Sequence, residues 1–301
     1  MNYIEWKKWM LEHPWSLRCG KGKLSKKYNV PEEYVTRARS EIKNKNINKV
    51  KILILDIETS PMKAYVWKRW KENISLDQTI SEWFMISWAA KWLGDPNTLG
   101  DCVNPEEAMN EDDKRICSSL WDLLDQADIV IAHNANHFDI PRINSRLVIN
   151  NLPPTASFKI IDTLQVAQKQ FGFSSNKLDA LAGYFNIPAK IDTDFTLWRD
   201  CLNGIQEALD YMLKYNKKDV EILEQVYLRL RPWIKNHPNI ATISNSSRPI
   251  CPICGSEHIA KYDNKYHHTV LSKYQQYYCV NCGAILRDRH KVNKPTQLIS
   301  V

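Results

Sequence analysis

Two groups of residues in this chain have the types and the spacing that metal-ion chemistry requires. The first is two Cys-x-x-C pairs near the carboxyl end: Cys251, Cys254, Cys279 and Cys282. Each pair is followed by a glycine that permits a tight turn, and 24 residues separate Cys254 from Cys279. This spacing predicts a zinc ribbon with one structural Zn²⁺, because so small a segment needs a metal to fold.

Acidic side chains form the second group. Asp56 and Glu58 end the apolar run KILILDIE, and their i, i+2 spacing directs both carboxylates to one face of a strand. Converging carboxylates repel each other, and a divalent cation removes that penalty; exposure to solvent at the strand end is an equal alternative. Asp139 follows a second apolar run, ADIVIAHN, and taken alone it is better explained as a helix N-cap.

The third acidic stretch is YNKKD, in which Tyr215 and Asp219 are four residues apart and share one face of a helix. Asp219 is in line with the apolar stripe of Met212, Val220 and Leu223. The helix therefore turns Asp219 inward, where an unpaired acid is costly. An ion pair on the helix surface is the alternative.

The elements that must position these residues can be predicted from apolar runs and helical periodicity. We predict strands at residues 51–58, 83–93, 98–103, 127–134 and 157–163. We predict helices at residues 106–127, 141–150, 163–171, 176–186 and 204–231. Strands alternating with helices predict an α/β fold whose sheet is partly parallel, with antiparallel early strands. Asp56, Glu58 and Asp139 then lie near the ends of neighbouring strands, where sites are built in such folds.

The stretches LDIET, HNANHFD and YNKKD occur in this order over about residues 50–231. They resemble the motifs of the DEDD superfamily of 3′–5′ exonucleases in its tyrosine-bearing subclass. That subclass includes the proofreading domains of family B polymerases and standalone phage and bacterial nucleases. The histidine of the other subclass is replaced here by Lys214. The resemblance implies a ribonuclease H-like mixed five-stranded sheet with flanking helices, and hydrolysis of phosphodiesters from a 3′ end.

The same resemblance implies roles for single residues. Two Mg²⁺ or Mn²⁺ ions are expected on four carboxylates, which are those of Asp56, Glu58, Asp139 and Asp219. Tyr215 is expected to orient the attacking water, and Asn134 to contact the terminal nucleotide. Phe138 is expected in the core. Asp162 is better explained as the cap of the following helix than as an auxiliary acid.

Two other functions remain open. The first is an endonuclease on the same fold that cuts within a strand or at branched structures. The second is a non-catalytic protein that binds nucleic acid and retains the acids as relics.

Charge divides the chain into three parts. Residues 1–49 hold 12 Lys and Arg against 5 Asp and Glu, residues 50–231 hold 20 against 26, and residues 232–301 hold 9 against 3. Basic flanks attract polyanions, although solvated flanks are an equal explanation. We predict three domains with these boundaries: a helical unit, a ribonuclease H-like exonuclease domain and a zinc ribbon domain.

The first of these units contains a short helix, a turn at Asn29 and a second helix opened by Pro31. The apolar stripe of the second helix leaves Arg37 and Arg39 exposed. This arrangement resembles a helix-turn-helix reader of duplex DNA. It makes DNA the first choice of substrate and leaves RNA open. A helical hairpin that only packs on the next domain is the alternative.

Two aromatic segments also suit nucleic acid. In WKRWKE, Trp67 and Trp70 either stack on bases, with the neighbouring cations on phosphates, or pack against the sheet. The ribbon carries basic residues and five tyrosines, which favours nucleic-acid binding over protein docking.

Composition excludes other classes of protein. Hydrophobic residues are 44% and charged residues 25%, as in globular proteins, and no apolar run reaches the ~18–20 residues of a membrane span. Because the charged amino terminus does not resemble a signal peptide, we expect a bacterial or phage-infected cytoplasm. Nucleic acid is the expected partner; the sequence does not identify a protein partner, and the replication or repair machinery is one candidate.

Overall fold

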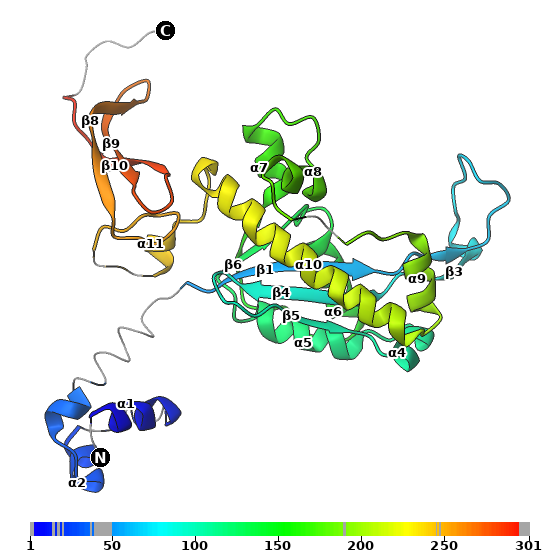
Figure 1. Ribbon diagram of the computed structural model, residues 1–301, viewed down its shortest axis with the longest axis horizontal. Helices are drawn as coiled ribbons and strands as arrows, with labels where there is room; N and C mark the ends of the chain where they lie inside the picture. The colour runs from blue at the N-terminus through cyan, green and yellow to red at the C-terminus, as the bar shows by residue number, and fades with distance from the viewer. Residues whose placement is uncertain are drawn as a thin grey trace.

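The structure is a computed structural model that describes residues 3–13, 16, 19, 21–36, 38, 50–188, 191–244, 246 and 248–294. Its central element is a sheet of five strands: β1 (Ile52–Thr59), β4 (Met85–Trp92), β5 (Leu99–Cys102), β6 (Ile129–Ala132) and β7 (Lys159–Asp162). The strand order is β5-β4-β1-β6-β7 (Figure 1). β4 is antiparallel to β1 and β5, whereas β6 is parallel to β1 and β7. The predicted mixed α/β sheet is confirmed.

Strand β1 is buried on both faces because its side chains alternate between two hydrophobic clusters. Leu53, Leu55 and Ile57 pack in one cluster with residues of α5 (Lys114–Leu124) and α6 (Asp139–Ile149). Ile52 and Ile54 pack in the other with the long helix α10 (Gln206–Leu230). The same alternation places Asp56 and Glu58 on the face that α10 covers.

The helix predicted at residues 106–127 is two helices, α4 (Pro105–Asn110) and α5. Glu111 ends α4 in the left-handed conformation, with φ of 56°. Asp113 is buried beside the break, where it accepts a hydrogen bond from the Met85 backbone N–H at 2.8 Å and pairs with Arg146 at 2.6 Å. Because this carboxylate must turn inward to hold β4 and α6, a single straight helix is excluded.

Three shorter helices complete the domain: α7 (Thr163–Gln170), α8 (Leu178–Tyr184) and α9 (Phe195–Leu202). α7 and α8 match their predicted positions, and α9 was not predicted. The short strands β2 (Lys63–Ala64) and β3 (Thr79–Ser81) were also not predicted. They form a hairpin that projects beyond the carboxyl end of β1 (Figure 1).

The amino-terminal unit contains α1 (Tyr3–Glu12), α2 (Lys21–Tyr28) and further helical residues at 32–36 and 38. Asn29, with φ of 49°, makes the turn after α2. Six residues of this unit are buried together: Trp6, Met10, Leu24, Val30, Val35 and Ala38. Arg37 and Arg39 lie outside the described residues.

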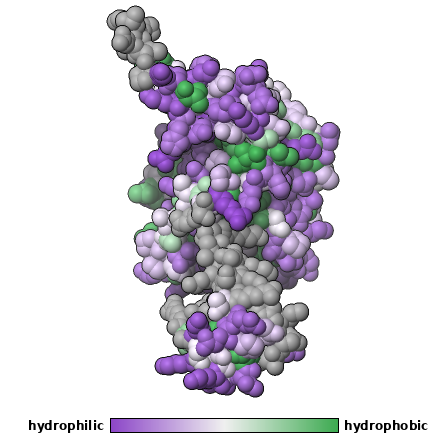
Figure 2. Space-filling view, turned by 90° about the vertical axis from the view of Figure 1, so that its left-hand side faces the viewer, coloured by the Kyte–Doolittle hydropathy of each residue, from purple (hydrophilic) through white to green (hydrophobic). Residues whose placement is uncertain are grey.

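The carboxyl-terminal part follows η3 (Arg231–Trp233) and α11 (Ile240–Ile243). Its antiparallel sheet has the order β10-β9-β8, with β8 at Ile259–His268, β9 at Lys273–Cys279 and β10 at Ile285–Lys291. The face of this part seen in Figure 2 is mostly hydrophilic, with small hydrophobic patches. Ile240 joins it to the core, because its side chain packs in the same cluster as Tyr227 and its N–H donates to the Pro252 carbonyl at 2.8 Å.

None of the helices in the described part of the chain has both the length and the apolar character that crossing a bilayer requires.

Candidate active site and metal-ligand clusters

Three acidic side chains converge where the end of β1 meets the middle of α10. Carboxylate oxygens of Asp56, Glu58 and Asp219 all lie within 4.8 Å of one another. Asp219 is buried, and the two acids of β1 are half-buried. Carboxylate charges this close repel one another, and a bound cation offsets the repulsion. The cluster therefore has the chemistry of a site for a hard divalent cation.

Asn216 holds Asp56 in this cluster. Its Nδ2 donates to Oδ2 of Asp56 at 2.5 Å, and its Oδ1 accepts a hydrogen bond from the Ser87 hydroxyl at 3.3 Å. Asn216 is fully buried, and Ser87 lies on β4 directly opposite Glu58. The amide thus ties α10 to two strands and fixes the rotamer of one acid. Sequence reasoning missed this residue, although it lies inside the YNKKD stretch.

Asp139 is the first residue of α6 and is 1% exposed. Neither of its carboxylate oxygens accepts a hydrogen bond within the described part of the chain. Burial raises the pKa of Asp139 to about 7. The backbone groups of Asp139 and Ile57 lower this pKa, but by less than burial raises it. The N-cap alternative is wrong, since Phe138 is the N-cap and no side chain caps this helix.

The position of Asp139 relative to the other acids differs from the expectation of a single four-carboxylate group. The cluster defined by mutual approach within 4.8 Å contains Asp56, Glu58 and Asp219, and Asp139 is outside it. However, Asp139 lies beside the backbone of Ile57, the residue between the two acids of β1. It is therefore a neighbour of the cluster, on the side of α6.

Tyr215 lies one helical turn before Asp219 and is buried. Its ring makes an edge contact with Trp198 of α9, with the ring centroids 6.2 Å apart and the planes at 74°. Helix α9 thus contacts the tyrosine ring through Trp198. The signal for α9 was present in the sequence, because Asp194 caps it by accepting a hydrogen bond from the Thr196 N–H.

The model of the RNase_H superfamily matches residues 99–231, from β5 to the end of α10. The matched residues include Asp139, Tyr215 and Asp219. The fold is ribonuclease H-like.

Among solved structures, a family B DNA polymerase from the hyperthermophilic archaeon Pyrobaculum calidifontis is similar, with a TM-score of 0.44 and 12% identity. The similarity covers 74% of this chain and 32% of the polymerase, so the chain spans about a third of that protein's length. The comparison with curated proteins found no match.

Asp162 organises the loop after β6 in this ribonuclease H-like domain. It caps α7 by accepting hydrogen bonds from the N–H groups of Leu164 and Gln165, as the preferred interpretation predicted. It also accepts hydrogen bonds from the N–H groups of Asn134 and Asn136, each at 3.1 Å. Because Asn134 has a left-handed φ of 77°, this acid holds the predicted nucleotide contact in a special backbone conformation.

Arg142 is a second residue that sequence reasoning missed. Its guanidinium lies over the rings of Trp83 at 4.6 Å and Phe138 at 4.5 Å, and its Nη1 donates to Oγ1 of Thr59 at 3.0 Å. Among the described residues it forms no ion pair with a carboxylate. Thr59 follows Glu58, and Phe138 precedes Asp139. A cation is therefore held at the edge of the acid cluster.

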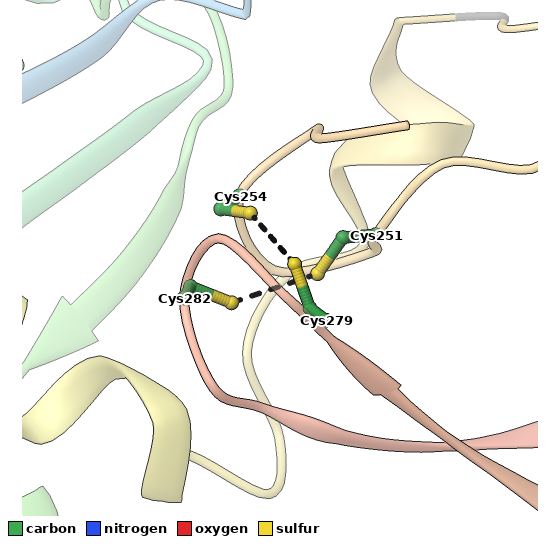
Figure 3. A group of neighbouring side chains, drawn as sticks. All are labelled: Cys251, Cys254, Cys279 and Cys282. Carbon is green, nitrogen blue, oxygen red and sulfur yellow. Dashed lines mark hydrogen bonds between the residues drawn. The ribbon is translucent and has the colours of Figure 1, made fainter. Parts of the chain in front are cut away.

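The four cysteines form a second cluster in the carboxyl-terminal part (Figure 3). All four are free thiols, and their sulfur atoms lie within 4.8 Å of one another. Sγ of Cys251 is 3.8 Å from that of Cys282, and Sγ of Cys254 is 3.6 Å from that of Cys279. Four sulfurs at about 2.3 Å from a central ion in a tetrahedron are about 3.8 Å apart. The cluster has the dimensions of a tetrahedral thiolate site.

Together, the ribonuclease H-like fold and the carboxylates at the end of β1 support a nuclease that acts on nucleic acid.

Proposed function

We propose that this chain is a metal-dependent 3′–5′ exonuclease that hydrolyses phosphodiester bonds, with DNA as the favoured substrate. The observation that carries the proposal is the convergence of Asp56, Glu58 and Asp219 at the end of β1. We assign the nuclease domain to residues 50–231, with a nucleic-acid-binding helical unit at residues 1–49 and a ribbon domain at residues 232–301.

The donor set fits hard divalent cations. It consists of carboxylate oxygens, which Mg²⁺ and Mn²⁺ prefer, and includes the buried carboxylate of Asp139, whose oxygens have no hydrogen-bond partner in the described residues. We assign two such ions to Asp56, Glu58, Asp139 and Asp219. When bound, they lower the pKa of the attacking water and stabilise charge on the phosphodiester.

Side chains around the acids orient the metal ligands, the attacking water and the substrate. Asn216 holds Asp56 in one rotamer, which preserves the geometry of the acid cluster between turnovers. The hydroxyl of Tyr215, one turn before Asp219, orients the attacking water by hydrogen bonding. Asn134, on a loop fixed by Asp162, contacts the terminal nucleotide.

DNA is favoured because of the amino-terminal unit, in which a helix, a turn at Asn29 and further helical residues follow one another. We assign substrate contacts to Arg37 and Arg39 from the sequence. The basic ribbon adds a further polycationic segment, and RNA is the alternative substrate.

We also propose that Cys251, Cys254, Cys279 and Cys282 bind one structural Zn²⁺. The sulfur–sulfur distances of 3.6 and 3.8 Å support a tetrahedral site with four thiolates and no open position.

The test is digestion of 5′-labelled single-stranded DNA in Mn²⁺ or Mg²⁺, with a circular single strand in parallel. We expect a ladder that shortens from the 3′ end and an intact circle. Asp219→Asn should lower kcat on the order of 10³-fold or more, because it removes a carboxylate ligand. Asp122→Asn, which changes an exposed acid on α5, is the matched control and should retain full activity.

Cutting of the circle would contradict the exonuclease and support the endonuclease. Absence of metal-dependent degradation of DNA and RNA would support a non-catalytic binding protein. Equal activity of Asp219→Asn and the control would show that the assigned site is wrong.

A further inference from the structure

The hairpin between β2 and β3 is an ordered arm. Its base is fixed to the sheet because the Ser60 N–H donates to the Phe84 carbonyl and the Phe84 N–H donates to the Ser60 hydroxyl, both at 2.9 Å. Further out, the Tyr65 N–H donates to the Gln78 carbonyl at 2.9 Å, and Gln78 Nε2 donates back to the Tyr65 carbonyl at 3.1 Å. The two ends of the segment 65–78 are therefore joined by hydrogen bonds.

A second anchor ties the arm to the helical layer. Glu111, at the end of α4, pairs with Lys63 at 2.7 Å and accepts a hydrogen bond from the Ser81 hydroxyl at 2.9 Å. Both strands of the hairpin are thus held by one carboxylate. The arm is positioned relative to the end of β1, where the acid cluster lies.

The tip of this arm exposes large aromatic side chains. Trp67 is 92% exposed and Trp70 is 82% exposed, so the alternative in which these tryptophans pack against the sheet is wrong. Tyr65, at 73%, is exposed on the same segment. Folding gains nothing from leaving these rings in water, and clustered exposed apolar groups mark interaction surfaces.

Cations alternate with the tryptophans. Lys68, Arg69 and Lys71 lie in the stretch WKRWKE, and residues 65–78 as a whole hold these three cations against two acids, Glu72 and Asp77. None of the three forms an ion pair with another described residue. Unpaired cations beside exposed aromatic rings suit single-stranded nucleic acid, whose bases stack on rings while its phosphates take the cations. A protein interface suits them less, since lysine is depleted at such interfaces.

The arm is also continuous with the acid cluster. Trp83, two residues beyond β3, holds the guanidinium of Arg142, which contacts Phe138 and Thr59 next to the acids. Arg142 therefore contacts both Thr59, next to the acids, and Trp83, next to the base of the arm. The tip of the arm, farther from the acid cluster, carries the same two kinds of group, which are aromatic rings and cations.

We propose that residues 65–78 form an arm that binds the single-stranded part of the nucleic-acid substrate upstream of the 3′ end. This inference rests on the proposed nuclease function and adds a binding surface to it. Bases stack on Trp67 and Trp70, and phosphates contact Lys68, Arg69 and Lys71.

The experiment measures affinity and hydrolysis separately with the full chain. Fluorescence anisotropy without divalent ions gives the Kd for a long single-stranded oligonucleotide, and hydrolysis in Mn²⁺ is measured on that oligonucleotide and on a trinucleotide too short to reach the arm. Trp67→Ala with Trp70→Ala should raise the Kd about tenfold or more. The same variant should raise KM for the long substrate and leave trinucleotide hydrolysis unchanged.

Replacing Lys68, Arg69 and Lys71 by Gln should reduce the slope of log Kd against log salt by about 2, because three phosphate contacts are lost. Trp233→Ala, which alters an exposed tryptophan at the other end of the domain, is the control and should bind like the wild type.

The outcomes separate the two proposals. An unchanged Kd in the tryptophan and lysine/arginine variants would overturn the proposal that the arm binds nucleic acid. An arm that binds a protein instead would give this result. Failure of the wild type to hydrolyse either substrate would overturn the nuclease, while the Kd values would still decide the arm. Equal loss of hydrolysis on both substrates would show that the variants damage the acid cluster, which contradicts a role confined to binding.

Discussion

The cysteine cluster and the acid cluster both bring ligand atoms together, but they are supported in opposite ways. Apart from the cysteines, the hydrophobic cluster around the thiols contains only Ile253, Ala284 and Leu286 among the described residues. The acids lie at the rim of a core to which β1, β4, β6 and helices α5, α6 and α10 contribute. We therefore expect the fold around the cysteines to depend on the proposed ion, whereas the acids are held by a hydrophobic core that packs without one.

On the proposed function, a metal ion would have two different roles in this chain, a structural one at the cysteines and a catalytic one at the acids. Four thiolates with no further position close a site, so an ion there can only stabilise. Carboxylates at a half-buried strand end leave room for substrate, at the cost of mutual repulsion. We expect loss of the ion to unfold the region around the cysteines and to leave the fold around the acids intact.

The largest effect is expected at the cysteines. Cys279→Ser should remove the bound Zn²⁺ and unfold the ribbon, because about 10–16 kcal/mol of binding free energy stabilises a small zinc domain. Hydrogen exchange should then show loss of amide protection in β8, β9 and β10 and full protection in β1. Cys19→Ser, outside the ribbon, is the control. Retention of amide protection in β8–β10 after Cys279→Ser would show that the fold around the cysteines does not depend on the metal.

A smaller effect is expected at Asn216. Asn216→Ala frees Asp56 to change rotamer, which should lower activity or Mn²⁺ affinity about 10–100-fold, as is usual for residues that orient metal ligands. The measurement is the Mn²⁺ dependence of kcat, with the exposed Asn110→Ala on α4 as the control. Because a purely structural role would lower the melting temperature without changing the Mn²⁺ dependence, an unchanged dependence would contradict a positioning role.

A third expected effect is a dependence of stability on pH. Burial raises the folded-state pKa of Asp139 to about 7 from its ordinary value of 3.8. As pH rises between these values without divalent ions, the unfolded chain loses this proton before the folded protein does, so the free energy of unfolding falls. Above about pH 7 the loss is constant.

Asp139→Asn removes this titration. Its Tm relative to the wild type should therefore rise from pH 4 to pH 7 and then level off, by about 2–4 °C for each kcal/mol. Calorimetry checks this, and Mn²⁺ should reduce the difference. A difference in Tm that does not change with pH would show that Asp139 is not a buried, unpaired acid.

The sheet could be predicted because its strands are buried on both faces. KILILDIE and ADIVIAHN are nearly continuous apolar runs, and only a strand between two helical layers accounts for them. Asp219 could be predicted to face inward because its neighbours on α10 form an apolar stripe. The break at Glu111 could not, because it follows from the buried pairing of Asp113 with Arg146, 33 residues away.

The roles of Asn216 and Arg142 could not be predicted from the sequence either, because their contacts are also long-range. Asn216 contacts a residue 160 positions earlier, and Arg142 contacts Thr59, 83 positions earlier. Neither pairing leaves a local pattern. The exposure of Trp67 and Trp70 was also undecided, because the same apolar residues suit packing and stacking equally well. By contrast, the cysteine spacing is local, and the cluster it predicted is present.

Helix α10 has one further consequence. It carries Asp219 near its middle, and near its end Tyr227 donates a hydrogen bond to Nε2 of His237 at 2.9 Å and shares a cluster with Ile240, the residue that bonds to Pro252 beside the cysteines. A continuous helix rotates about 100° and advances about 1.5 Å per residue. Inserting one residue between Asp219 and Tyr227 would therefore rotate the carboxyl-terminal part about the helix axis. The length of α10 between these residues thus fixes the separation and relative orientation of the two clusters.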